Sequence, residues 1–585
     1  MPPDLAFDGR AHLMWIKYMF RSVIKQAFHL HVLIKGVVSM YCVQCEQSNK
    51  GGCAVKVGSC GKTATVADQQ DVLLRVMLGV SVYADRAAQK GAHDPAVDAF
   101  TPYAWFTTLT NVNFDESRFN ALIVQALDMR AAAKTLAAKA GADLSDLPEP
   151  ANWNPGATPS ELAAAAPFAA IQRFMDRDGP SVVGLRNLVL YGLKGTAAYS
   201  EHARVLGTEE QAVCAEFHRI SAFLAADPTD VDALVRESLA VGALNLKVME
   251  LLDAANTGRF GHPEITHVRM SPKAGKALLV SGHDLGDLET ILKQTEGKGI
   301  NVYTHGELLP ANTYPGLKKY PHLAGNYAGA WQDQQRDFDA FPGAIVMTSN
   351  CLINPEIKGY ADRLFTAGPV GWEGIPHIAN HDFTPAITCA LAQPGFGEDA
   401  PEETIVAGFA RHTVMGVADT LLDMIGKGEV KNLFLIGGCD GARPGRNYFH
   451  DLAMATPKDS LVLTLGCGKF RFNREDMGDI NGIPRVLDVG QCNDAYSAIQ
   501  IAVAVAGALK VGVNDLPLHY AISWFEQKAT AVLLSMLHLG IRKIHLGPTL
   551  PQFLTPEVLG VLIDNFDIRP TGEAESDLAG MLQAA

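Results

Sequence analysis

Short apolar runs alternate with helical patterns beyond about residue 270, and this alternation constrains the fold more than any other feature of the chain. Such alternation predicts parallel sheets that are covered by helices. The predicted strands are KALLVSG, INVYTHG, AIVMTSN, VKNLFLIGG, SLVLTLG, PRVLDVG, HYAISWF and KIHLGPTL. Stretches rich in Pro and Gly near 366–412 separate the first three strands from the rest, so we expect two α/β domains, 262–410 and 411–585.

Seven of these strands are followed by a residue that can bind a transition metal. In chain order the seven are His283, Glu307, Cys351, Cys439, Cys467, Cys492 and Glu526. Ligands bind at the carboxyl ends of strands in open α/β sheets, so seven side chains from two neighbouring sheets could converge. Each cysteine taken alone could be a buried turn residue, but the regularity across seven strands favours a shared metal site. Cys214 and Cys389 follow no such strand and are interpreted as structural.

The ligand types restrict the metal. Four thiolates are soft donors that suit iron–sulfur, zinc or copper(I), whereas two carboxylates are hard donors that favour an oxygen-rich iron environment. This mixture predicts an iron cluster with both sulfide and oxygen bridges. A structural zinc ion is satisfied by four ligands and fits the set poorly.

A second group of thiols lies near the start of the chain, in MYCVQCEQSNKGGCAVKVGSCGK. Cys42, Cys45, Cys53 and Cys60 have the spacing C-x2-C-x7-C-x6-C, which suits zinc or a cubane iron–sulfur cluster. The ligands further along the chain favour iron–sulfur. With no secretory signal recognised, we expect a reducing, cytoplasmic location, where clustered cysteines hold metal more often than disulfides.

Several other functions are disfavoured by the sequence. CGKT, at 60–63, resembles the end of a phosphate-binding loop, but Lys56 stands where that motif requires Gly. No G-x-G-x-x-G follows a strand, so NAD or flavin binding is not expected. The net charge of −14 argues against nucleic acid as a partner, and no apolar run is long enough for a membrane span.

The region from about 64 to 257 has helical periodicity, and we predict two helical bundles, 64–150 and 158–257, within a helical domain of residues 40–261. Thr158, Pro159 and Glu161 predict a capping box at one helix start, and Thr229 marks another start of the same kind. Residues 1–39 carry a charge of +3 against −17 for the remainder, which allows three interpretations: a mis-called start before Met40, which we favour, a targeting peptide, or a membrane-surface segment.

The motifs CVQCEQ, SGHDLGDLE, VYTHGELLPA, TSNC, GGCDG, GCGKFRFN, GIPRVLDVGQCND, WFEQKA and IHLGPTLPQFL span nearly all of residues 40–585. Together they resemble the hybrid cluster proteins, a family also called hydroxylamine reductases or prismane proteins. The resemblance implies an α plus α/β fold, with a helical domain of two three-helix bundles followed by two Rossmann-like domains.

The resemblance also implies two cofactors. The four N-terminal cysteines would hold a [4Fe-4S] cluster, and the seven strand-end residues would hold a hybrid 4Fe–2S–2O cluster with a persulfide on Cys439. Family members with [2Fe-2S] have a much longer middle spacing, so the short gap between Cys45 and Cys53 favours [4Fe-4S]. The last gap, x6, differs from the usual x5.

The implied activity is reduction of hydroxylamine to ammonia and water, reduction of nitric oxide to nitrous oxide, or both. Glu526, Glu307 and Lys528 are the candidate catalytic residues, with Lys528 placed on the side of Glu526 if this segment is extended. An external donor, such as an NADH-dependent reductase or a ferredoxin, would supply electrons. His305 and His545 are interpreted as core or supporting residues.

Two alternatives remain open at this stage. A nitric-oxide-responsive sensor or protein trans-nitrosylase would use the same cluster. A carbon monoxide dehydrogenase would need nickel and additional N-terminal cysteines. Only four cysteines cluster near the start of this chain, which disfavours that activity.

Overall fold

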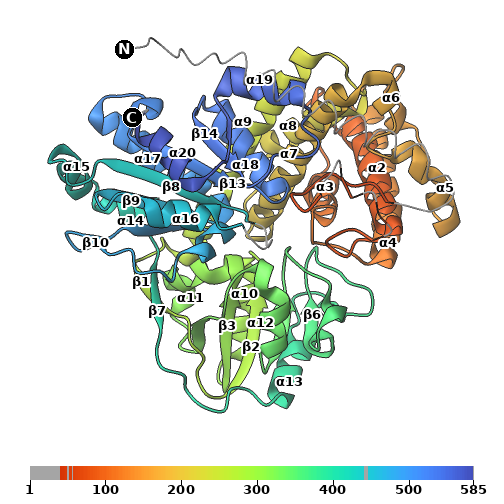
Figure 1. Ribbon diagram of the computed structural model, residues 1–585. Helices are drawn as coiled ribbons and strands as arrows, with labels where there is room; N and C mark the ends of the chain where they lie inside the picture. The colour runs from red at the N-terminus through yellow and green to blue at the C-terminus, as the bar shows by residue number, and fades with distance from the viewer. Residues whose placement is uncertain (1–39, 49–51, 54, 56, 441–445, 584–585) are drawn as a thin grey trace, which may run out of the picture.

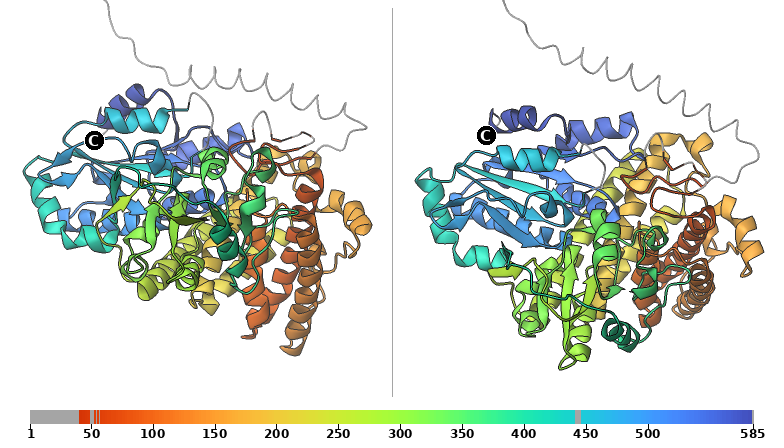
Figure 2. Two further views of the ribbon diagram at one scale, coloured as in Figure 1. Left: turned by 90° about the horizontal axis from the view of Figure 1, so that it is seen from below. Right: turned by 60° about the horizontal axis from the view of Figure 1, so that its bottom comes forward.

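The structure is a computed structural model that describes residues 40–48, 52–53, 55, 57–440 and 446–583 (Figure 1). The interpretations of residues 1–39 therefore lie outside the described residues. Three neighbouring parts make up the described chain: a helical part, a first sheet and a second sheet, which follow one another along the colour bar (Figures 1 and 2). This mixed helical and parallel-sheet architecture confirms the predicted fold class.

The helical part contains eight α-helices among its described residues. They are α2 (Ala64–Ala88), α3 (Pro95–Thr107), α4 (Glu116–Lys139), α5 (Pro159–Ala169), α6 (Met175–Asp178), α7 (Pro180–Val205), α8 (Gln211–Ala225) and α9 (Val231–Phe260). The predicted capping box is confirmed: Thr158 caps α5 and Glu161 bonds back to its backbone. Helix α9 starts one residue later than predicted, because Asp230 rather than Thr229 accepts the hydrogen bond from the Ala233 amide.

The helices group differently from the predicted division of the sequence. Helix α8 packs on α2, whereas α7 and α9 pack with α18 (Gln527–His538), a helix that comes from the C-terminal part of the chain. Glycines permit this contact, since a Cβ at Gly195 would lie 2.3 Å from the Gln527 carbonyl oxygen. Helical periodicity reveals a buried face but not the helix that covers it, so α18 was not foreseen as a member of this group.

The first sheet is entirely parallel, in the order β4-β3-β2-β5-β6. Its strands are β2 (Lys276–Ser281), β3 (Ile300–His305), β4 (Leu323–Asn326), β5 (Ala344–Met347) and β6 (Leu364–Thr366), with helices α10 (Leu285–Thr295), α11 (Pro315–Lys318), α12 (Gln334–Ala340) and α13 (Thr384–Ala392) around them. The three predicted strands are confirmed, and the short β4 and β6 were missed.

The second sheet is also parallel and has the doubly wound order β12-β9-β8-β13-β14-β15. Its strands are β8 (Asn432–Gly438), β9 (Ser460–Leu465), β12 (Val486–Gly490), β13 (Leu518–Ser523), β14 (Ile544–Gly547) and β15 (Arg569–Pro570). The neighbouring helices are α14 (Arg411–Gly416), α15 (Ala418–Gly426), α16 (Tyr448–Ala455), α17 (Ala495–Leu509), α18, α19 (Pro556–Phe566) and α20 (Ala574–Gln583). All five strands predicted here are confirmed, and the two-residue β15 was missed.

Two antiparallel ribbons complete the described strands. In the first, β1 (Thr266–Arg269) pairs with β7 (Thr404–Ala407), at the two ends of the segment that forms the first sheet. The second joins β10 (Asp479–Ile480) to β11 (Ile483–Pro484). Neither ribbon was predicted, because β1 and β7 are only partly buried and lack the continuous apolar run that marks the equally short β5. Within the described residues, no helix has the length and apolar character needed to cross a membrane.

The packing of α18 on α9 provides a test of the fold. A Cβ at Gly242 would lie 2.1 Å from the Leu534 carbonyl oxygen, so Gly242→Leu should force the helices apart and lower the free energy of unfolding by about 2–3 kcal/mol. A urea titration of the anaerobic protein measures this loss. Gly258→Ala, on the same helix but with no atom within 4 Å, is the matched control and should change stability by less than about 1 kcal/mol. Equal effects of the two substitutions would contradict the packing described.

Candidate metal centre

One cavity, of about 160 Å³, gathers the residues that follow the predicted strands. Its lining includes all seven candidate ligands, His283, Glu307, Cys351, Cys439, Cys467, Cys492 and Glu526, together with Lys528. All eight side chains are buried. The structure therefore brings seven residues that are far apart in the sequence to one place between the two sheets.

The two sheets contribute unequally to this cavity. Three of the residues follow strands β2, β3 and β5 of the first sheet, and four follow β8, β9, β12 and β13 of the second. In each sheet the chain winds in opposite directions from a central pair, β2 and β5 or β8 and β13, and such a reversal leaves a crevice at the carboxyl ends of the strands. Cys351 has a left-handed φ of 75°, an unusual conformation that commonly marks a functional position.

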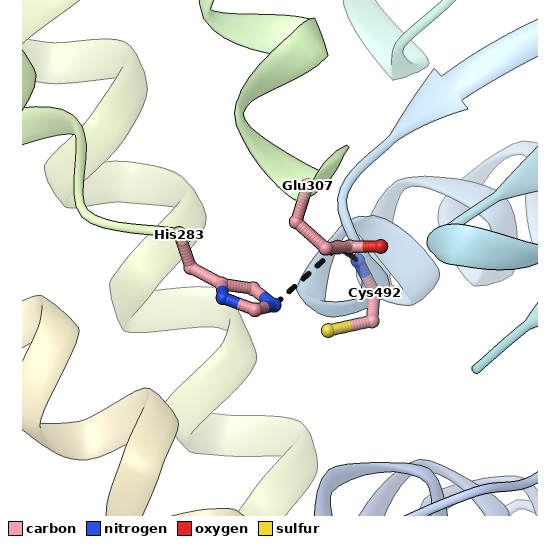
Figure 3. Close-up of side chains that lie close together, drawn as sticks. All are labelled: His283, Glu307 and Cys492. Carbon is pink, nitrogen blue, oxygen red and sulfur yellow. Dashed lines mark hydrogen bonds and ion pairs between the residues drawn. The ribbon is translucent and has the colours of Figure 1, made fainter. Parts of the chain in front are cut away.

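His283, Glu307 and Cys492 form the tightest group of possible ligands (Figure 3). One donor atom from each lies within 4.8 Å of the others, and His283 Nε2 is 3.7 Å from Glu307 Oε2. The Cys492 backbone amide donates a hydrogen bond of 2.9 Å to the same carboxylate oxygen. An imidazole, a carboxylate and a thiol at these separations are a donor set that can hold a transition metal.

Both ring nitrogens of His283 have polar partners at the edge of the cavity. Nδ1 lies 2.9 Å from the Ser349 hydroxyl, and Nε2 lies 2.8 Å from the Lys528 ammonium, which must be the donor. Burial, followed by the Lys528 charge, holds the pKa of His283 well below its usual value. A neutral imidazole is the form that binds a metal, and a metal at Nε2 would take the place of the hydrogen bond from Lys528.

All ten cysteines of the chain are among the described residues, and all are free thiols. Burial raises the pKa of Cys492 to about 12 and those of Cys351, Cys439 and Cys467 above their ordinary value. Four buried thiols side by side are costly to ionise unless a metal replaces their protons. The donor set of the cavity thus fits an iron–sulfur group.

Lys528 reaches the cavity by a different geometry from the one expected. The segment after Glu526 is not extended: Glu526 caps helix α18, and its side chain accepts a hydrogen bond from the Lys528 amide. The first turn of the helix nevertheless brings the Lys528 ammonium to 3.7 Å from Glu526 and 2.9 Å from the Asn350 side-chain oxygen. Two residues that are two positions apart in a helix normally point to different sides. Glu526 and Lys528 both reach the cavity because Glu526 is the N-cap, outside the first turn.

Gln491 was missed by the sequence analysis. Its side-chain amide donates to the backbone carbonyls of His283, at 3.1 Å, and of Glu307, at 2.8 Å. One residue of the second sheet therefore binds the ends of two strands of the first. Its place directly before Cys492 was the available signal, but no residue pattern identifies a partner more than 180 positions away.

The four N-terminal thiols lie near one another in a separate loop. Cys42 and Cys53 exchange two backbone hydrogen bonds, of 3.2 and 2.8 Å. Burial, followed by the adjacent Cys60 and Cys42 thiols, raises the pKa of Cys45. Cys45 is buried, whereas the other three thiols are partly exposed. This arrangement fits a metal cluster close to the protein surface.

The N-terminal loop is bonded directly to the segment that carries Glu526. The Glu46 amide donates to the Phe525 carbonyl at 2.9 Å, and the Gln527 side chain donates to the Gln44 carbonyl. The Glu46 carboxylate, which is fully buried, pairs with Arg446 at 2.5 Å and accepts from the Thr549 hydroxyl at 2.8 Å. These bonds hold the four thiols beside the cavity, and neither Glu46 nor Gln527 was singled out from the sequence.

The rest of the cavity is apolar and extends away from the candidate ligands. Alternate residues of the second sheet, such as Leu435 and Ile522, form one wall. Small side chains of α17, Ala498 and Ala502, face the same space, and the lining continues to the exposed residues Asn514 and Leu539. The lining of this one cavity thus extends from the buried candidate ligands to residues at the protein surface, and most of it is apolar.

The remaining candidates lie elsewhere. His305 ends β3 and is fully buried, 2.9 Å from the Ser281 hydroxyl and 3.5 Å from Asp337. His545 lies in β14 and lines a different cavity. Cys214 is on α8 and Cys389 on α13, outside the lining of the metal-site cavity.

Comparison with known proteins identifies relatives that match nearly the whole chain. The sequence model of the Prismane/CO dehydrogenase family matches residues 40–579. A protein named hydroxylamine reductase from Burkholderia lata is 55% identical over 551 residues, which cover 93% of this chain and 99% of that protein. A protein of the same name from Acidithiobacillus ferrooxidans is 54% identical over 549 residues, covering 92% of this chain and 98% of its own.

Solved structures resemble the fold at much lower identity. Carbon monoxide dehydrogenase IV from Carboxydothermus hydrogenoformans has a TM-score of 0.54 and 18% identity, with 97% of each chain covered. The carbon monoxide dehydrogenase from Thermococcus sp. AM4 has a TM-score of 0.51 and 18% identity, covering 95% of this chain and 93% of that one. At this identity the likeness concerns the fold alone.

The bridging role of Gln491 can be measured. Gln491→Ala leaves two buried carbonyl groups without their donor, and we expect the free energy of unfolding to fall by about 1–3 kcal/mol. The measurement is a urea titration of the anaerobic protein, compared with Gln125→Ala on the exposed face of α4. Loss of stability in both variants alike would show that Gln491 does not bind the two sheets together.

Proposed function

This chain belongs to the Prismane/CO dehydrogenase family, and we propose that it is an iron–sulfur oxidoreductase that reduces hydroxylamine. The observation that carries the proposal is the convergence of one imidazole, two carboxylates and four thiols from two sheets on a single buried cavity. The high identity to proteins named hydroxylamine reductase, over more than nine-tenths of the chain, supports the same activity.

We assign two cofactors to the two groups of cysteines. Cys42, Cys45, Cys53 and Cys60 would hold a [4Fe-4S] cluster, because four close thiols without a disulfide are the donor set of such a cluster. The seven cavity residues would hold a hybrid 4Fe–2S–2O cluster, with a persulfide on Cys439. Its mixture of soft sulfur and hard oxygen donors supports this assignment.

The reaction consumes protons as well as electrons: hydroxylamine takes up two electrons and two protons and yields ammonia and water. When bound, the cavity cluster would supply the electrons and an open iron position for the substrate. The chain must deliver protons to a buried site, and the Glu526 carboxyl is the group that would carry them. The Lys528 ammonium lies 3.7 Å away. Burial alone would lower the pKa of Lys528, but nearby Cys492 and Glu526 outweigh burial and raise that pKa, so the ammonium stays positive and stabilises negative charge beside the substrate. Burial raises the pKa of Glu526, which helps it to hold a proton for transfer.

Glu307 and the surrounding side chains have a second task, which is to keep the site ordered and dry. Glu307 is held by the Cys492 amide and, through its backbone, by Gln491. The apolar walls of the cavity exclude bulk water, so that protons reach the substrate only from positioned groups. We assign three residues to catalysis: Glu526 as the proton carrier, Lys528 as the charged group beside it, and Glu307 as a metal ligand held in position.

A specific observation also favours nitric oxide as a substrate. Nitric oxide is a small and weakly polar gas, and the apolar space beside α17 suits its passage to the cluster. Two molecules of nitric oxide with two electrons and two protons yield nitrous oxide and water. A nitric-oxide sensor or trans-nitrosylase would use the same space, and steady-state turnover separates catalysis from sensing.

Electrons are proposed to arrive from a separate protein, an NADH-dependent reductase or a ferredoxin. The partial exposure of Cys42, Cys53 and Cys60 supports this proposal, because a donor could approach a cluster held by these thiols. The hydrogen bond from Glu46 to Phe525 then links the thiol loop to the residue next to Glu526.

The role of Glu526 is tested by Glu526→Ala. We expect hydroxylamine reduction to fall by about 100-fold or more, since both a ligand and a proton carrier are removed, and the electron paramagnetic resonance (EPR) spectrum of the cavity cluster to change. Glu296→Ala, at an exposed position after α10, is the control. Full reductase activity with an unchanged cluster spectrum in Glu526→Ala would refute the assignment.

The passage of nitric oxide is tested by narrowing the apolar space. Ala502→Phe should lower kcat/KM for nitric oxide by about tenfold while leaving kcat almost unchanged, because access is obstructed and the chemical step is not. Ala508→Phe, on an exposed face of the same helix, should leave both constants unaltered. Stopped-flow turnover under anaerobic conditions provides the measurement, and an unchanged kcat/KM in Ala502→Phe would rule out this route.

A further inference from the structure

Two buried lysines lie behind the N-terminal thiols and have no part in the reaction described above. The Lys62 ammonium is 3.8 Å from Cys42 Sγ and 2.5 Å from the side-chain oxygen of Gln70. The Lys194 ammonium is 2.6 Å from the side-chain oxygen of Gln44, which stands between Cys42 and Cys45 in the sequence. Their exposed fractions are only 2% and 1%.

Among the described residues neither lysine forms a close ion pair with a carboxylate, although the charge of Asp71 acts on both at longer range. The oxygen atoms that accept hydrogen bonds from the two ammonium groups belong to the neutral side-chain amides of Gln70 and Gln44. Asp71 lines the same small polar pocket as the two lysines. A buried ammonium is costly unless an opposite charge compensates it.

The four thiols are the anionic partner that the geometry provides. Four thiolates around an iron–sulfur core carry a net negative charge, and both lysines converge on the loop that holds them. Lys62 belongs to the CGKT stretch, whose lysine would contact a phosphate in a nucleotide-binding loop. Here the Lys62 ammonium lies 3.8 Å from Cys42 Sγ, so the lysine of this stretch contacts a thiol and not a phosphate.

We propose, on the basis of the function proposed above, that the buried Lys62 ammonium, with Lys194 behind it on Gln44, raises the reduction potential of the N-terminal cluster. An added electron makes the cluster more negative, and a cation in a buried setting stabilises the more negative form the more strongly. Net charge near the cluster and hydrogen bonding are two of the factors that set such potentials. The lysines thereby make the centre easier for an external donor to reduce.

The position of Lys194 adds a link to the cavity. It is carried by α7, where the next residue, Gly195, contacts the Gln527 carbonyl beside Glu526. Lys194 therefore lies close to the segment that carries Glu526. The positive charge would thus stabilise an added electron on the side of the N-terminal cluster nearest to Gln527 and Glu526.

The test is an anaerobic redox titration followed by the EPR signal of the reduced N-terminal cluster. Lys62→Met keeps the length of the side chain and removes its charge. At the wild-type midpoint, the ratio of reduced to oxidised cluster should fall at least tenfold, which for one electron is a shift of about 59 mV to more negative potential. Lys194→Met should shift the midpoint in the same direction, and Lys62→Arg should retain most of the wild-type potential.

Lys298→Met, at an exposed position far along the chain, is the control and should leave the midpoint unchanged. Wild-type midpoints in both Lys62→Met and Lys194→Met, with full iron and sulfide content, would overturn the proposal. If Lys62→Met fails to assemble the cluster, Lys194→Met decides the question alone. Absence of iron from the wild-type N-terminal thiols would instead refute the proposed function, so the two failures are distinguishable.

Discussion

The meeting of two parallel sheets at the carboxyl ends of their strands is the constraint on which the rest of the structure depends. Each sheet winds in both directions from a central pair of strands, and each therefore offers a crevice at that end. Three candidate ligands come from one crevice and four from the other, so neither sheet could form the site alone. Gln491 fastens the two crevices together through the carbonyls of His283 and Glu307.

The helical part is joined to this site through one helix. Helix α18 follows Glu526 directly and packs between α7 and α9, where Gly195 and Gly242 permit close contact. The N-terminal loop is fastened to the same segment by Glu46 and Gln527. Hydrogen bonds thus join the loop that carries the four N-terminal thiols to the segment that carries one of the cavity residues.

Buried positive charge accompanies both groups of donors. Lys528 faces the cavity ligands, and Lys62 and Lys194 face the N-terminal thiols. Each is costly to bury without an anion nearby. The chain thus carries cations at the places where thiolates and bound clusters would concentrate negative charge, and this supports the assignment of metal to both sites independently of any single ligand.

The sequence by itself determined eight of the eleven described strands of the two parallel sheets, the capping box at Thr158, and the identity of the residues that follow seven strands. These features are local: an apolar run, a capping pattern and the next residue in the chain suffice to recognise them. Only the tertiary structure decided the strand order, the membership of α18 in the helical group, the bonds of Gln491, and the position of Lys62 and Lys194 behind the thiols. Each of these depends on contacts between distant residues, and periodicity in a sequence encodes which side of an element is buried but not what buries it.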